Sequence, residues 1–114
     1  MARSAATYDV FTAIAEPTRR ELLTLLAEEE RPVGELVPLV ELDQPSVSKH
    51  LGVLREVGLV DMRQDGRRRL YRTNAMGIKQ VHDWASHFER YWRRQLGRIK
   101  ARAESMASKK STNN

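Results

Sequence analysis

One short segment of this chain, residues 44–55, combines residue types that could do chemistry. At 3.6 residues per turn it is predicted to form a helix with two different faces. Val47, Leu51 and Leu54 lie on one face, and the other face is small, polar and cationic, with Lys49 near its centre. Hydroxyls and a lysine on an exposed helix face suit the major groove of DNA, where the N-terminal residues of such a helix reach the base edges. The alternative is the ordinary solvated face of an amphipathic surface helix.

The distribution of charge favours a polyanionic partner. The chain of 114 residues carries 20 Lys and Arg against 15 Asp and Glu, a net charge of +5. Residues 1–43 hold four basic and nine acidic side chains, a net of −5, whereas residues 44–114 hold 16 basic and 6 acidic ones, a net of +10. A nucleic acid is the simplest reason to concentrate positive charge from residue 44 onward, because each neutralised phosphate releases condensed counterions.

A second cationic feature follows the candidate helix. The alternating residues 59–64, the turn signal Asp65-Gly66 and residues 67–73 predict a two-stranded hairpin. Such a hairpin is not stable alone and must pack on helices. The arginines that gather on it are Arg63, Arg67, Arg68, Arg69 and Arg72. A basic hairpin after a helix-turn-helix is a wing that can reach flanking phosphate or the minor groove; the alternative is a solvated arginine-rich surface.

Helices must position both features. Apolar residues at helical spacing predict helices over residues 7–15, 17–27 and 33–40, before the one that begins near residue 44. Asp43 is a good N-cap for that fourth helix, and Gly58 is a plausible left-handed cap at its end. The third helix, the turn at Glu41-Leu42 and the fourth helix together make a helix-turn-helix.

The C-terminal part is predicted as one long helix, from Ile78 to about Ala103. Its apolar residues recur every three or four positions and include both tryptophans of the chain. A small domain has little core to cover such a stripe, and an exposed aromatic stripe marks an interface. We therefore expect a homodimer formed through the first and last helices, the alternative being packing within one chain. The residues expected at the dimer seam are Tyr8, Phe11, Trp84, Phe88, Tyr91, Trp92 and Leu96.

Composition excludes other classes of protein. The chain has no cysteine, which excludes disulfides, thiol redox sensing and thiolate metal sites. The absence of a long apolar run and of a secretory h-region predicts a cytoplasmic protein with no membrane segment. No Gly-rich phosphate loop or plausible carboxylate pair is present, so an enzyme is not expected. The expected layout is a disordered N-terminus over residues 1–6, one domain over 7–103 and a flexible tail over 104–114.

The order of these elements, and several local sequences, resemble the ArsR-type (arsenic-repressor-like) winged-helix transcriptional regulators. The match covers roughly residues 7–100. The segments that carry it are 16–23, 33–36, 44–51, 53–60 and 65–71. The resemblance implies a fold that is mainly α with a two-stranded β wing, in the order α-α-α-α-β-β-α. It also implies a dimeric repressor that binds an inverted repeat in double-stranded DNA.

The resemblance further implies which residues contact DNA. The family's recognition-helix contacts fall on Gln44, Ser46, Ser48, Lys49 and His50, and its wing contacts fall on Arg67, Arg68 and Arg69. Arg55 and Arg63 complete the predicted DNA-binding set. Many members carry Lys or Arg where Gly52 stands, so a long cation is missing here from the outer face of the helix.

The metal sites of the family are not expected in this chain. Metal-sensing members use a cysteine pair in the third helix, and the corresponding residues 36–39 include no metal ligand. Some members bind zinc on the last helix, where this chain has His82, Asp83, His87 and Glu89. His82 and His87 diverge by about 140° around a helix, whereas Asp83 and His87 share a face. Asp83 and His87 could supply two ligands of a zinc site that the dimer partner completes by symmetry, and the alternative is that these are ordinary polar surface residues. No metal or other cofactor is predicted.

Two functions are therefore weighed. The first is a sequence-specific DNA-binding regulator, expected to be a repressor on a palindromic operator. The second is an architectural or protein-interaction winged helix without sequence-specific readout of DNA. The sequence names neither the effector nor the operator.

Overall fold

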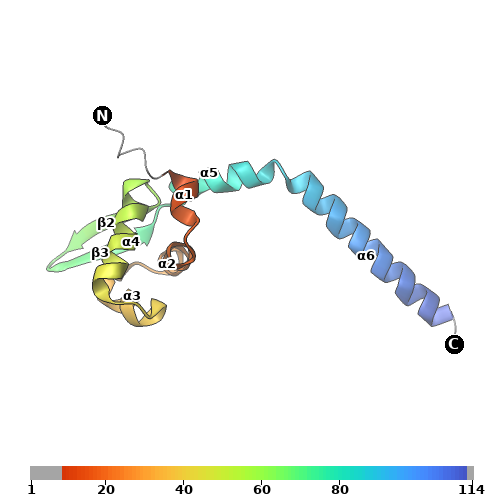
Figure 1. Cartoon of the computed structure of the whole chain (residues 1–114), viewed down its shortest axis with the longest axis horizontal. Helices are drawn as coiled ribbons and strands as arrows, with labels where there is room; N and C mark the ends of the chain where they lie inside the picture. Colours follow the sequence, from red (N-terminus) through yellow and green to blue (C-terminus); the bar gives the residue numbers. More distant parts are fainter. Residues whose placement is uncertain (1–8, 113–114) are drawn as a thin grey trace. The chain divides into compact units, whose positions relative to one another are not determined.

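The computed structural model of the chain describes residues 9–112 (Figure 1). It divides the chain into two units, residues 1–81 and residues 82–114. The elements in chain order are α1 (Val10–Ile14), α2 (Pro17–Glu28), β1 (Arg31–Pro32), α3 (Val33–Val40), α4 (Gln44–Glu56), β2 (Val60–Asp65), β3 (Arg68–Thr73), α5 (Ala75–Ser86) and α6 (Glu89–Thr112). Residues 1–6, predicted to be disordered, and Tyr8, predicted at the dimer seam, lie outside the described range.

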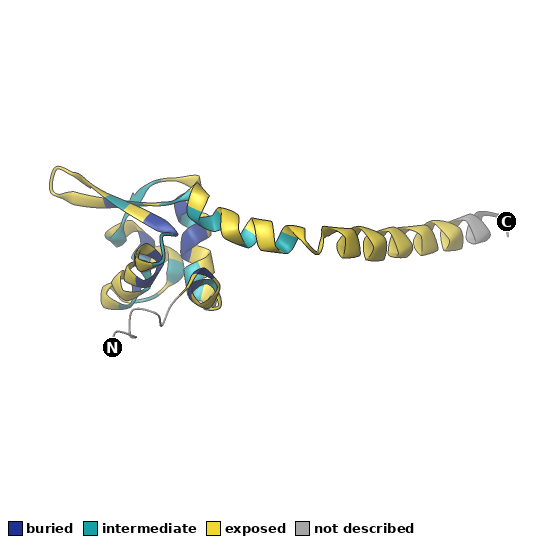
Figure 2. Cartoon of the chain, turned by 90° about the horizontal axis from the view of Figure 1, so that it is seen from above, coloured by how far each residue is buried: buried dark blue, intermediate teal, exposed yellow. Residues whose placement is uncertain are grey.

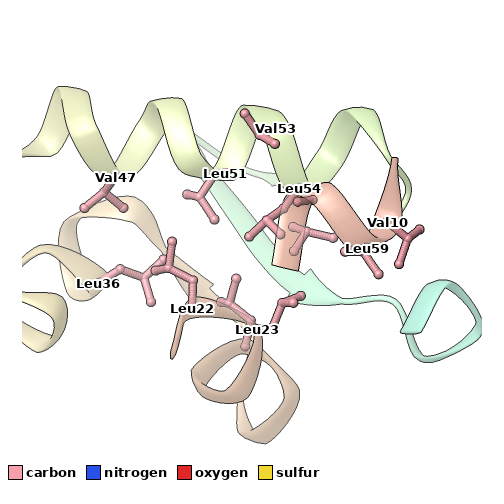
Figure 3. Packing of buried hydrophobic residues seen from close by; sticks show 12 residues of the cluster. Val10, Leu22, Leu23, Leu36, Val47, Leu51, Val53, Leu54 and Leu59 are labelled. Atoms are coloured by element: carbon pink, nitrogen blue, oxygen red, sulfur yellow. The ribbon is translucent and has the colours of Figure 1, made fainter. Parts of the chain in front are cut away.

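An aliphatic core holds the first unit together. The helices α1 to α4 and the start of β2 contribute to it, and its largest fully buried side chains are Leu22, Leu26, Leu36, Leu51, Leu54, Leu59, Val47 and Val60. Val47, Leu51 and Leu54 of α4 face α2 and α3 in Figure 3, which confirms the predicted inner face of this helix. Burial of this apolar surface fixes how α4 is rotated about its axis, and therefore which side chains it turns outward.

The five-residue helix α1 is held mainly by side chains. At its start the Asp9 carboxylate accepts a hydrogen bond of 2.7 Å from the Thr12 backbone N–H. At its end the Arg19 Nε donates to the Ala13 carbonyl oxygen at 2.6 Å. The Arg20 guanidinium donates to the carbonyl oxygen of Ile14 at 2.8 Å. Both arginines belong to α2, so the first turn of α2 satisfies carbonyl groups that a helix terminus leaves unpaired.

The wing is a three-stranded antiparallel sheet in the order β1-β3-β2, rather than the two strands predicted. In the additional pairing, Arg31 lies opposite Tyr71 and Pro32 lies opposite Leu70. A two-residue strand is too short for an alternating pattern, and its proline fits only at a sheet edge, because proline has no N–H to donate. The predicted Asp65-Gly66 turn lies at the tip of the β2–β3 hairpin, which projects from the helices of the first unit in Figure 1.

A short break interrupts the predicted long C-terminal helix, so the fold has one helix more than expected. The backbone N–H groups of His87 and Phe88 donate to the carbonyls of Trp84 and Ala85, three residues back, at 3.1 and 3.0 Å. The Ser86 hydroxyl donates to the carbonyl of its own helix four residues back, at 2.7 Å, an interaction that bends helices. The apolar stripe resumes in α6, so periodicity alone does not reveal the break.

The helix α6 extends to Thr112, past the predicted end near residue 103 and into the segment 104–114 expected to be a flexible tail. Its residues are exposed from its start to residue 107 (Figure 2). None of the helices between residues 9 and 112 has both the length and the apolar character needed to cross a bilayer.

Candidate nucleic-acid interface

The helix α4 begins at a well-formed cap. The Asp43 carboxylate accepts a hydrogen bond of 2.8 Å from the Ser46 backbone N–H, as an N-cap residue does. Hydrogen bonding from the Ser46 side chain, and then from its backbone N–H, lowers the pKa of Asp43 below its ordinary value. The preceding helix α3 ends at Val40, and the residue after it, Glu41, adopts the left-handed conformation with φ of 55°. That sharp reversal and the cap together fix the angle at which α4 leaves the turn.

The outward face of α4 presents several of the predicted DNA-binding residues. The side chains of Gln44, Ser48 and Lys49 are exposed, and Ser46 is half-buried beside the cap. Gly52 also lies on the exposed face, and a Cβ atom added there would meet no atom within 4 Å. This face therefore has room for close approach of a large partner and carries donors suited to base edges.

The wing stands beside this face. A hollow of about 340 Å³ lies between the N-terminal half of α4 and the sheet. Its lining residues are Pro32, Val33, Gln44, Ser48, Arg67, Arg68, Arg69 and Tyr71. The structure thus brings two predicted base-reading residues together with the three predicted wing arginines, all of them exposed. These groups come from parts of the chain about 20 residues apart, and only the fold places them side by side.

Arg55 and Arg63, also predicted to bind DNA, line a different hollow, formed by the end of α4, the turn after it and the hairpin strands. The Arg63 guanidinium makes a two-pronged ion pair with Glu30, in which Nε and one terminal nitrogen each lie 2.8 Å from a carboxylate oxygen. The same hydrogen bond raises the pKa of Arg63 and lowers that of Glu30. Arg63 is therefore already neutralised in the isolated chain, unlike the arginines at the tip.

His50 differs from the other predicted contacts because it is half-buried. Its Nδ1 atom lies 3.3 Å from a terminal nitrogen of Arg19, at the start of α2. Burial is the largest cause that lowers the pKa of His50, and the charge of Arg19 is the next. Neither Arg19 nor Glu30 was expected at the interface, and no sequence signal marks them, because their partners lie 31 and 33 residues away.

The residues predicted for the dimer seam are large and exposed wherever the structure describes them: Phe11, Trp84, Phe88, Tyr91, Trp92 and Leu96. Within the second unit, the Trp84 and Phe88 rings meet edge to face with centroids 5.3 Å apart. Phe88 and Tyr91 follow at 6.4 Å. The prediction of an exposed aromatic stripe is thus confirmed for this unit, while the dimer remains a prediction.

No group of three or more His, Asp or Glu side chains in the described part of the chain could hold a metal ion. The His82 ring instead lies 3.5 Å from the Asp83 carboxylate, and the His87 Nδ1 atom lies 3.2 Å from the carbonyl oxygen of Trp84.

Comparison with known proteins agrees with this geometry. Residues 16–62 match the family model of bacterial regulatory proteins of the arsR family. The chain is 44% identical over 59 residues to the biofilm growth-associated repressor of Agrobacterium fabrum, and this alignment covers 52% of this chain and 50% of the repressor. It is 36% identical over 84 residues to the HTH-type transcriptional regulator Rv2034 of Mycobacterium tuberculosis, and this alignment covers 74% of this chain and 76% of the relative.

Solved structures show the same fold. A crystal structure described as a possible transcriptional regulator for arsenical resistance superposes with a TM-score of 0.64 at 38% sequence identity, over 83% of this chain and 96% of the other.

The fold and the clustered side chains define a winged helix-turn-helix regulator. The chain belongs to the ArsR family of bacterial regulatory proteins. The resemblance seen in the sequence is confirmed. The chain spans only 50% to 65% of the length of three curated relatives that it matches.

Proposed function

We propose that this protein is a sequence-specific transcriptional repressor that binds a palindromic DNA operator as a homodimer. The observation that carries the proposal is the hollow between α4 and the wing, where Gln44 and Ser48 lie beside Arg67, Arg68 and Arg69. Specific DNA recognition needs two parts: hydrogen-bonding side chains on a helix that reach base edges, and cations beside them that bind phosphate. Such a repressor acts in the cytoplasm, where bacterial DNA lies.

The two parts of the interface have different tasks. The outward face of α4 enters the major groove, where Gln44, Ser46, Ser48 and Lys49 read base edges. The wing arginines hold phosphate and supply affinity that does not depend on sequence. Because the tip arginines are exposed and Arg63 is paired with Glu30, we assign the phosphate contacts to the tip.

The aromatic stripe supports the proposed homodimer. In the described chain, Trp84, Trp92 and Leu96 are 55%, 59% and 61% exposed, which is costly for residues of this size unless a partner covers them. A second copy is the simplest partner, because a two-fold axis places two recognition helices about 34 Å apart, one turn of DNA, on a palindromic site.

The proposed interface is tested by selecting binding sites from random duplexes and then measuring affinity on the selected site and on unrelated DNA. Lys49→Ala should weaken specific binding most. Arg68→Ala should weaken binding to all sequences and reduce the salt slope by about 0.9. Arg98→Ala, on α6, is the matched control. Equal losses for Lys49→Ala and Arg68→Ala on every duplex contradict the assigned tasks, and a specific-to-nonspecific ratio near one contradicts specific repression.

The proposed dimer is tested by sedimentation of the intact chain at micromolar concentration. The wild type should sediment as a dimer, and the double variant Trp92→Glu/Leu96→Glu as a monomer, because charges replace the centre of the apolar stripe. Arg90→Glu changes charge on the opposite face of the same helix and should leave the dimer intact. A wild-type protein that sediments as a single protomer contradicts the proposal.

A further inference from the structure

One side chain, Arg19, connects three helices of the first unit. Its Nε atom donates to the Ala13 carbonyl oxygen in α1 at 2.6 Å. A terminal nitrogen of the same guanidinium lies 3.3 Å from Nδ1 of His50, on the recognition helix α4. Arg19 itself belongs to the first turn of α2. The corner between α1 and α2 is thereby joined to the recognition helix through one imidazole ring.

The chemistry of this contact fixes the state of the ring. A guanidinium carries only N–H donors and stays charged at any ordinary pH, so Nδ1 of His50 must be the acceptor. The proton of the neutral ring is then on Nε2. A protonated imidazole has a donor at both nitrogens and cannot accept from Arg19. The contact therefore exists only while His50 is neutral.

The surroundings of the ring favour that neutral form. The charged groups that act on it are Arg19 and Glu16 from the start of α2 and Lys49 from α4 itself. Partial burial, Arg19 and Lys49 all lower the pKa of His50, and only Glu16 opposes them. From α1 the junction receives the backbone carbonyl of Ala13. Together these causes favour the neutral ring, which gains its proton at a lower pH than an ordinary imidazole does.

We propose that Arg19 and His50 are positioning residues for DNA recognition: Arg19 holds α4 against the corner of α1 and α2 by donating to the neutral His50 ring, and protonation of the ring releases that hold. His50 then acts on operator affinity through Arg19 rather than by contacting DNA. This inference rests on the proposed function, because its readout is operator affinity. It also gives the expected pH dependence an unusual sign, since an added positive charge near DNA ordinarily strengthens binding.

Two amide substitutions distinguish the role of the ring's Nδ1 from that of its Nε2. In His50→Asn the amide oxygen sits on Cγ, where Nδ1 was attached, and can still accept from Arg19. In His50→Gln the amide extends to the place of Nε2 instead. We expect His50→Asn to bind the selected operator within about twofold of wild type. We expect His50→Gln and Arg19→Ala each to lose about five- to tenfold, the net scale of one typical intramolecular hydrogen bond. The reverse order, with Gln retained and Asn lost, overturns the proposal, because Nε2 would then be the working atom.

The pH dependence of operator affinity distinguishes this role from simple packing, because a packing role of His50 would not depend on its protonation. Between pH 7 and pH 5 wild-type affinity should fall, whereas His50→Asn, which has no titrating ring, should lack this fall. Arg19→Ala should be weak at both pH values and should also lack it. His87→Asn is the matched control, and it should retain the wild-type fall. A wild-type affinity that rises towards pH 5, or a fall that persists in His50→Asn, overturns the proposal.

Ring titration by NMR on the free protein separates failure of this inference from failure of the proposed function. Arg19→Ala should raise the pKa of His50, because a cation and a donor to the neutral ring are both removed. An unchanged His50 titration overturns the inference even if the protein binds its operator. A shifted titration in a protein that selects no duplex sequence contradicts repression, and with it the positioning role.

Discussion

Gly52 offers a direct test of how the recognition helix lies on DNA. It is exposed on the outward face of α4, one turn after Lys49 and Ser48, and a Cβ atom added there has open space. Gly52→Lys therefore places a long cation beside the proposed phosphate path without a clash. It also replaces the residue that is least favourable in a helix interior, apart from proline.

Both effects have a calculable size. One additional phosphate contact steepens the salt slope of log affinity by about 0.9, so the gain of Gly52→Lys over its control should shrink about 3.5-fold between 50 and 200 mM salt. The control is Gly52→Ala, which should stabilise the folded protein by about 1 kcal/mol through helix propensity alone. Gly52→Lys should stabilise it by somewhat less, because lysine is a weaker helix former than alanine.

The assays are fluorescence anisotropy with the selected operator at a series of salt concentrations, and urea unfolding of the same preparations. If Gly52→Lys and Gly52→Ala have the same salt slope, residue 52 does not reach phosphate, and the proposed orientation of α4 is wrong. If Gly52→Ala is more stable but binds the operator less well, the glycine is needed because the helix backbone approaches the DNA closely at this point.

Three further predictions concern packing, the wing and the helix cap. Gly77→Ala should destabilise the first unit by about 1–3 kcal/mol in urea unfolding, because its Cβ would fall on the carbonyl oxygen of Gly58, and backbone must move to make room; unchanged stability contradicts this packing. Glu30→Gln should free Arg63 from its ion pair and steepen the salt slope of DNA binding by up to about 0.9 if Arg63 then reaches phosphate, an effect that the double variant with Arg63→Ala must abolish. The pKa of Asp43 is lowered in the folded protein, so its stabilising contribution is present above the ordinary value of 3.8 and is lost as the pH falls through the folded value. Asp43→Asn should keep the cap but remove this part of the acid sensitivity, measured as the unfolding midpoint from pH 5 to pH 2.

The elements of the fold were predictable where they rest on local periodicity. The inner face of α4, with Val47, Leu51 and Leu54, follows from helical spacing, and the hairpin follows from its alternating residues and the Asp65-Gly66 turn. The strand β1 was missed because two residues carry no period. The break before α6 was missed because the same apolar stripe continues on both sides of it.

The candidate site was predictable for residue types but not for side-chain partners. Sequence reasoning identified Gln44, Ser48 and the three tip arginines, and the fold brings these five together. It placed Arg63 and His50 among the DNA-binding residues and did not reveal that each of them has a side-chain partner elsewhere in the fold. The partners of both come from α2 or the connector after it, more than 30 residues away in the chain, and such distant pairs leave no local pattern.

The arginines that close the end of α1 have a consequence for how this region opens and closes. A helix of five residues is far shorter than the roughly 12–15 residues that an isolated helix needs in water, so α1 depends on its neighbour to exist. Its amide protons should exchange with solvent together with those of the first turn of α2, as one cooperative step rather than by independent fraying. A molecule that pulls α1 away would therefore unravel it and at the same moment loosen the start of α2, converting a local displacement into a loss of order.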